Sequence, residues 1–321
     1  MAVKSYWANE SEKQEIIEFI DYVFSKAHRP HDFASLLPKL YGKSSDGAAH
    51  HFVIREDGKL AATVLAYPVM MQIGESRLMT LGVGSVSTHP CARGKGYMKL
   101  LMDAVDDRAR ETGAAFAVLG GLRQRYGYFG YEQGGYQMNA LLTKTNVRHA
   151  LAKTEDVDIA VEAMREGGVR LCKALQERQP CFCARGEAAF ADVLRSWNNE
   201  PFVVSRGGEF AGFGTLRRNP DRCHIAELLL ENEADFPTVM KRLSMLHGDL
   251  SIAAAPWERS RAAWLSAVAE KFEISANHLY KIYEPDAVRD ACAQLGLPGV
   301  GFAFDGFSLP LPLYIAPPDA V

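Results

Sequence analysis

One junction constrains the fold of this 321-residue chain more than any other: a strand-like segment that passes through a glycine-rich turn straight into a helix. Residues 76–88 have the composition and spacing of a strand, and residues 97–112 have the apolar spacing of a helix. Residues 93–96, Arg-Gly-Lys-Gly, supply two cations and two positions without a Cβ. Because a helix N-terminus offers free N–H groups and a partial positive charge, the junction predicts a pyrophosphate site.

The elements around this junction predict a mixed sheet. Helical spacing covers 10–27 and 31–41, and Pro30 and Pro38 bound or interrupt the second of these stretches. A hairpin is predicted over 51–73, and a short buried strand over 114–119. Strands that first form hairpins and then cross over through a helix are typical of mixed sheets. The predicted class is therefore α/β (α+β).

The second half repeats this order more faintly. A hairpin is predicted over 202–216, followed by strand, helix and strand up to residue 255. We therefore expect tandem mixed-sheet domains of one fold, covering residues 1–148 and 149–300. Residues 301–321 contain four prolines among apolar residues, which predicts an extended C-terminal tail packing toward the active site.

Composition excludes several classes of protein. A net charge of −3 gives no basic field for nucleic acid, and 48% apolar residues indicate a folded globular protein. No apolar run is long enough for a membrane span, and no secretory signal is visible. The six cysteines are scattered without metal-ligand spacing, so we expect no metal site, reduced thiols and a cytoplasmic location.

Three phosphate-binding motifs are candidates for the glycine turn. A Walker loop requires G-x-x-x-x-G-K-[ST], which does not occur. A dinucleotide fingerprint requires a third glycine where Lys99 stands, which disfavours an NAD enzyme. The acetyl-CoA loop [QR]-x-x-G-x-[GA] fits from Arg93 to Met98, except that Met98 replaces the small residue.

The sequence therefore resembles the GNAT acetyltransferases. Residues 87–102, STHPCARGKGYMKLLM, are similar to their motif A, and residues 126–132, YGYFGYE, are similar to the segment after the next strand. With the tandem organisation, these motifs resemble the Eis-like (enhanced intracellular survival) acetyltransferases, in which a degenerate GNAT domain follows a catalytic one. That family ends in a third domain resembling sterol carrier proteins, for which too few residues remain here, so the protein looks like a shortened relative.

The resemblance implies a set of site residues. Tyr126 would be the general acid, and the terminal carboxylate on Val321 would act as base. The cofactor, acetyl-CoA as co-substrate, would contact Val86, Ser87, Thr88, Arg93, Gly94, Lys95, Gly96, Tyr97, Met98 and Gly121.

Acetyl transfer to an amine requires a neutral nucleophile, a stabilised oxyanion and a protonated thiol leaving group. A tyrosine with a pKa of about 10 can donate to a thiolate whose conjugate acid has a pKa of about 8.5. The alternative for Tyr126 is core packing, because it lies among other aromatic residues. His28, His31, His50 and His51 are candidate bases that we expect to be ordinary surface histidines.

The sequence and this resemblance thus predict an N-acetyltransferase that moves an acetyl group from acetyl-CoA to a primary amine by direct attack, with Tyr126 as general acid. A catalytically inactive CoA-binding or sensing module is the alternative. The acceptor, a small-molecule or peptide amine, is not identified: aminoglycosides, polyamines and lysine side chains remain open. A homo-oligomer also remains open.

Overall fold

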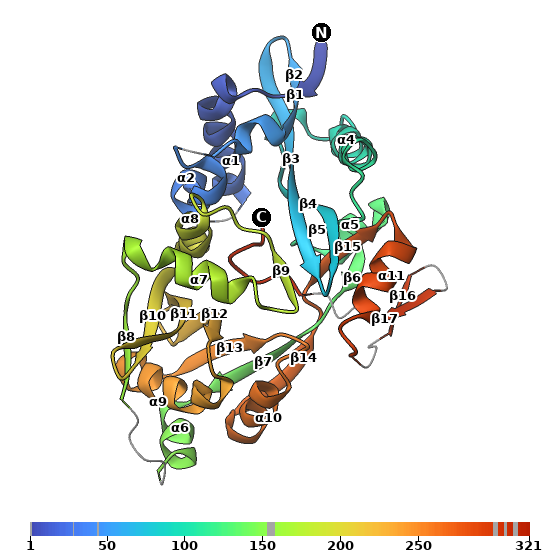
Figure 1. Cartoon of the computed structure of the whole chain (residues 1–321). Helices are drawn as coiled ribbons and strands as arrows, with labels where there is room; N and C mark the ends of the chain where they lie inside the picture. Colours follow the sequence, from blue (N-terminus) through green and yellow to red (C-terminus); the bar gives the residue numbers. More distant parts are fainter. Residues whose placement is uncertain are drawn as a thin grey trace.

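The structure is a computed structural model that describes residues 2–27, 29–43, 45–152, 158–297, 301–304, 307–310 and 314–321. Its described strands make two large mixed sheets, which form the upper and lower lobes in Figure 1, and a small hairpin. The predicted α/β (α+β) tandem class is confirmed. The first sheet has the order β1 (Val3–Trp7), β2 (His51–Glu56), β3 (Lys59–Ile73), β4 (Ser76–Thr88), β5 (Phe116–Leu119), β15 (His278–Ile282) and β6 (Glu132–Gly134), with β9 (Cys181–Cys183) paired to β3.

Helices cover both faces of the first sheet. Val53 and Leu65 pack on the side of α1, whereas their neighbours Ile54 and Val64 pack on the side of α4. This alternation follows from the two-residue period of a strand, and it explains why these strands are apolar on both faces. The helices of this lobe are η1 (Glu10–Glu12), α1 (Lys13–Ala27), α2 (Phe33–Leu36), α3 (Pro38–Tyr41), η2 (Gly47–His50), η3 (Pro90–Ala92), α4 (Tyr97–Thr112), α5 (Arg123–Tyr126) and η4 (Gly127–Phe129).

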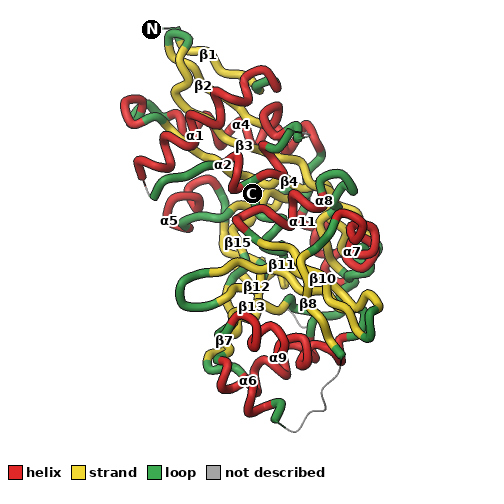
Figure 2. Tube along the Cα trace, turned by 90° about the vertical axis from the view of Figure 1, so that its left-hand side faces the viewer, coloured by secondary structure: helices red, strands yellow, loops and turns green. Residues whose placement is uncertain are grey.

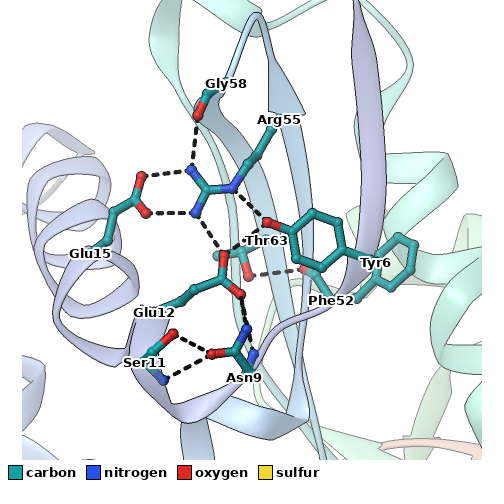
Figure 3. A network of polar contacts seen from close by, with 9 residues as sticks. All are labelled: Tyr6, Asn9, Ser11, Glu12, Glu15, Phe52, Arg55, Gly58 and Thr63. Carbon is teal, nitrogen blue, oxygen red and sulfur yellow. Dashed lines mark hydrogen bonds and ion pairs between the residues drawn. The ribbon is translucent and has the colours of Figure 1, made fainter.

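A polar network on Arg55 fastens α1 to the outer strands (Figure 3). The Arg55 guanidinium donates to both carboxylate oxygens of Glu15, at 2.8 and 2.6 Å, and to Glu12 Oε1 at 2.8 Å. Its Nε donates to the Tyr6 hydroxyl at 2.9 Å, so β1, β2 and α1 meet at one side chain. Bidentate pairing of this kind fixes geometry as well as charge.

The second sheet has the order β14 (Lys271–Ser275), β7 (Gln137–Leu142), β13 (Leu250–Ala254), β12 (Cys223–Leu230), β11 (Glu209–Arg218), β10 (Glu200–Arg206) and β8 (Ile159–Ala163). Its core is formed with α9 and α10. The helices of this half are α6 (Lys144–Ala150), η5 (Glu166–Gly168), α7 (Val169–Gln176), α8 (Phe190–Arg195), η6 (Ser196–Asn198), η7 (Glu233–Asp235), α9 (Phe236–His247), α10 (Arg259–Val268) and α11 (Pro285–Ala293).

The two lobes exchange strands across the predicted boundary at residue 148. β7 precedes that boundary but pairs with β13 and β14 of the second sheet. In return, β15 inserts between β5 and β6 of the first sheet, and β9 pairs with β3. The backbone leaves the first sheet at Gly135, whose φ of 59° suits glycine. Each sheet therefore depends on strands from both halves of the sequence.

The helical stretch predicted over 31–41 is interrupted at Pro38: it forms two short helices, because Pro38 cannot continue the hydrogen bonding of the first. Of the tail predicted to be extended, β16 (Gly301–Phe304) and β17 (Phe307–Pro310) pair as a hairpin. Residues 314–321 then return between the lobes, where both views place the C-terminus (Figures 1 and 2). Among the described helices, none is long and apolar enough to cross a membrane.

Candidate active site

β4 and β5 separate in the middle of the first sheet, and we call this separation the β4–β5 fork. Their parallel pairing ends at Val83 and Leu119, while β4 continues beside β3 to Thr88. The β3–β4 register shifts next to the same point, where Ser85 has a φ of 51°. The predicted contacts on β4, Val86, Ser87 and Thr88, all lie beyond the point where pairing with β5 ends.

The glycine turn after β4 has the form of an anion site. Gly94 and Gly96 have φ values of 79° and 80°, and a Cβ on either would meet no atom within 4 Å. Gly96 is the N-cap of α4, and the start of this helix has no cap from a side chain and no acidic residue in its first turn. Among the described residues, no side chain caps the N-terminal N–H groups of α4, which come from Tyr97 and Met98.

Glu56, at the end of β2, contacts this turn and was not predicted. Lys95 Nζ lies 2.8 Å from each Glu56 carboxylate oxygen, and the Tyr97 hydroxyl donates to Glu56 Oε1. The hydrogen bonds from Lys95 and Tyr97 lower the pKa of Glu56, and the bond to Glu56 raises the pKa of Tyr97. Lys95 is thus already held by a carboxylate, whereas exposed Arg93 has no ion pair among the described residues.

A buried series of hydrogen bonds supports Ser85 at the fork. The Tyr41 hydroxyl lies 3.0 Å from His51 Nε2 and 3.1 Å from Ser85 Oγ, and His51 Nδ1 lies 3.0 Å from Thr63 Oγ1. The Thr63 hydroxyl donates to the Phe52 carbonyl, so it accepts from His51 Nδ1. His51 Nε2 then accepts from Tyr41, and Tyr41 accepts from Ser85. This series of bonds therefore fixes the side chain of Ser85 at the fork.

His51 was expected at the surface, and that expectation is wrong: the side chain is fully buried. Burial lowers the pKa of His51 to about 3, so the ring is neutral, as the hydrogen-bond directions require. His31 Nδ1 contacts the Arg29 carbonyl at 2.7 Å, and His50 lies against the Tyr67 ring. His28 lies outside the described residues.

Tyr126 and Gly121, two predicted site residues, are in contact. A Cβ on Gly121 would lie 2.5 Å from Tyr126 Cε2, so only glycine permits the ring to pack there. The Tyr126 ring also meets the Tyr131 ring edge to face, with 6.4 Å between centroids. Burial raises the pKa of Tyr126, against a smaller lowering effect of Arg125. The phenol is therefore protonated at neutral pH.

Val321 lies beside the fork. A Cβ on Gly82 would come within 2.6 Å of Val321 Cγ2, and a Cβ on Gly84 within 3.1 Å of the terminal carboxyl carbon of Val321. Lys39 Nζ donates to the carbonyl oxygens of Pro318 and Ala320, each at 2.6 Å. Burial lowers the pKa of Lys39 to about 7.

A buried arginine fixes the same tail from the other lobe. The Arg185 guanidinium pairs with both carboxylate oxygens of Asp319 at 2.8 Å and with both of Glu227 at 2.9 Å. Its side chain is only 1% exposed. Burial alone would lower the pKa of Arg185, but the two carboxylates raise it well above its ordinary value. Breaking such a buried pair on one side is costly, so residue 319 is firmly placed.

A cavity of about 360 Å³ opens beside Val321 and the end of β5. Its walls come from the first sheet, including β9 and β15, from Trp197 of the second lobe, and from the tail. The described residues that line the cavity include Leu119, Gly120 and Val321, but not Tyr126. The structure therefore brings Val321 to the fork and Tyr126 to Gly121, which follows the lining residue Gly120.

Comparisons with known proteins agree with this architecture. The family model described as an acetyltransferase (GNAT) domain matches residues 7–134. No curated protein matches the sequence. A solved structure from Enterococcus faecalis V583, titled "Probable N-Acyltransferase", has a TM-score of 0.71 at 15% identity, over 91% of this protein and 75% of its own length.

Two further structures share the fold over most of the sequence. A GCN5-related N-acetyltransferase from Kribbella flavida has a TM-score of 0.67 at 14% identity, over 90% of this protein and 73% of its own length. Eis1 from Mycobacterium abscessus has a TM-score of 0.64 at 14% identity, over 90% of this protein and 76% of its own length. Residues 7–134 therefore match the model of a GNAT acetyltransferase domain, and the fold of most of the protein is similar to that of these structures.

Proposed function

We propose that the protein is an acetyl-CoA-dependent N-acetyltransferase that acts on a primary amine. The observation that carries the proposal is the arrangement of one lobe: the glycine turn at the start of α4, the β4–β5 fork, and a cavity beside the fork. A pyrophosphate, an extended thioester arm and an acceptor amine would need these three features side by side.

The residues around the fork fit acetyl-CoA. Open space at Gly94 and Gly96 leaves room for phosphate oxygens near the start of α4, and exposed Arg93 adds a cation. The backbone of Val86, Ser87 and Thr88 would hold the extended part of the cofactor, with Lys95, Tyr97, Met98 and Gly121 around it. When bound, acetyl-CoA supplies an activated acetyl group as a thioester.

Transfer by direct attack is favoured over an acetylated enzyme. Cys183 lines the cavity, but burial raises the pKa of its thiol well above the ordinary value. It therefore holds almost no thiolate, the form that attacks a thioester. In the proposed step the amine nitrogen bonds to the acetyl carbon, the carbon–sulfur bond breaks, and the sulfur takes the electron pair.

Two groups would move the protons. Tyr126, kept protonated by burial, would donate to the departing sulfur. The Val321 carboxylate, beside Gly84, would receive the proton of the amine. To test Val321, we would extend the protein by a few glycines, which keeps the tail but moves the charge. The role is supported if turnover falls, and it is refuted if the extended protein works at the normal rate.

The alternative, a CoA-binding or sensing module without turnover, is tested by one assay. The proposed enzyme releases CoA thiol when acetyl-CoA and a panel of primary amines are both present, with an equal amount of acetylated amine by mass spectrometry. Tight CoA binding without amine-dependent release would favour the sensing module. An acetylated protein formed from acetyl-CoA alone would contradict direct attack.

A further inference from the structure

The cavity beside Val321 adjoins a second one in the other lobe. The second cavity has a volume of about 290 Å³ and shares Trp197, His278 and Ala320 with the first. A molecule bound along both would therefore extend from the β4–β5 fork of the first lobe to the sheet of the second.

The cavity at the fork offers one carboxylate that is not neutralised by a partner in its described wall. Asp319 lines it, but both of its oxygens are paired with Arg185. His278 is uncharged, because burial lowers its pKa to about 4. Most of the other lining side chains are apolar, among them Val118 and Ile315. This end suits one ammonium group, at Val321, on an apolar body.

The second cavity carries the opposite charge. Arg217 lines it, and no carboxylate of the described residues lies within ion-pair distance of its guanidinium. Its Nη1 donates to the Trp197 carbonyl at 3.4 Å. His224 beside it is neutral, because burial and the charge of Arg217 lower its pKa to about 4. Asn199 and the remaining polar side chains of the wall are uncharged.

We propose that the acceptor is an amine that carries a carboxylate at its other end. The amine lies at Val321, the apolar body crosses Trp197, and the carboxylate pairs with Arg217. This assignment rests on the proposed function, in which Val321 receives the amine. It disfavours polyamines, because within the described walls of the two cavities no carboxylate besides Val321 is free of a basic partner.

The test uses ω-aminocarboxylates of increasing length, each paired with its methyl ester. The ester keeps the shape and the amine but removes the negative charge. Arg217→Gln removes the cation, and Arg217→Lys restores it. Arg218→Gln is the matched control, because the neighbouring Arg218 pairs with Glu200 and does not line this cavity. Calorimetric binding is measured together with CoA thiol release.

We expect the best aminocarboxylate to exceed its ester by about tenfold or more in kcat/KM, mainly through KM, as for a charge-assisted hydrogen bond. Arg217→Gln should abolish this preference, whereas Arg217→Lys and Arg218→Gln should keep most of it. Equal values for acid and ester in the unmodified protein, or a preference for diamines, would overturn the assignment. If no amine releases CoA, the proposed function fails, and the binding preference for acid over ester still decides the role of Arg217.

Discussion

Val321 and Gly82 lie so close that a Cβ on Gly82 would come within 2.6 Å of Val321 Cγ2. Gly82 stands in β4, one residue before β4 and β5 stop pairing, and Val321 belongs to the tail held by Lys39 and Arg185. The absence of a side chain at this position in β4 is therefore what allows the tail to reach the fork.

Gly82→Ala should displace the end of the tail and lower turnover by at least about tenfold, because small misplacements at a reacting centre are costly. The measurement is kcat with a saturating amine. Adding Val321→Gly to Gly82→Ala removes the clashing methyl groups and should recover part of the loss. If the double variant is no better than Gly82→Ala, the contact with Val321 does not explain the defect.

Tyr126→Phe should lower turnover by about 10²–10⁴-fold while the affinity for CoA stays unchanged, because only the proton donor is removed. Tyr131→Phe is the control, since Tyr131 is a buried tyrosine in ring contact with Tyr126. Rates are compared with a poor amine, for which chemistry limits the rate. Equal rates for the two variants would mean that Tyr126 packs in the core and does not act as the proton donor.

Stability should fall as the pH decreases from 7 to 5. His51 has a folded pKa of about 3, below the ordinary value near 6.5, so the unfolded protein takes up a proton first as the pH falls. The neutral His51 ring therefore contributes to the free energy of unfolding above pH 6.5, and this contribution is lost as the pH falls below 6.5. For His51 alone the loss is about 2 kcal/mol at pH 5. Urea unfolding of the protein and of His51→Gln at both pH values measures the effect. The same pH dependence in both proteins would exclude His51 as its source.

Local sequence signals located the parts of the site that lie close together in the sequence. The strand 76–88 and the helix 97–112 have the bounds predicted for them. The spacing of their apolar residues and the glycines at the turns determine both. The turn between them follows from the same signals.

Contacts between distant residues could not be predicted in this way. Arg185 and Asp319 are 134 residues apart, and β15 enters the first sheet from the second half of the sequence. The adjacent His50 and His51 have nearly the same neighbours in the sequence, yet His51 is fully buried against Tyr41, whereas His50 lies against the Tyr67 ring. The tertiary fold decides which of the two histidines is buried.

Calorimetric titration with acetyl-CoA shows whether the protein has a single acetyl-CoA site at the glycine turn. We expect about one molecule of acetyl-CoA per protein molecule, because the corresponding junction of the second half, residues 231–235, has no glycine, and its three carboxylates already pair with the arginines beside them. Gly96→Glu should abolish binding by placing a charge at the start of α4. Gly113→Glu, at the other end of α4, is the matched control: its φ is 65°, a Cβ there also meets no atom within 4 Å, and it should bind normally. Two equivalent sites, or normal binding by Gly96→Glu, would rule out a single acetyl-CoA site at the glycine turn.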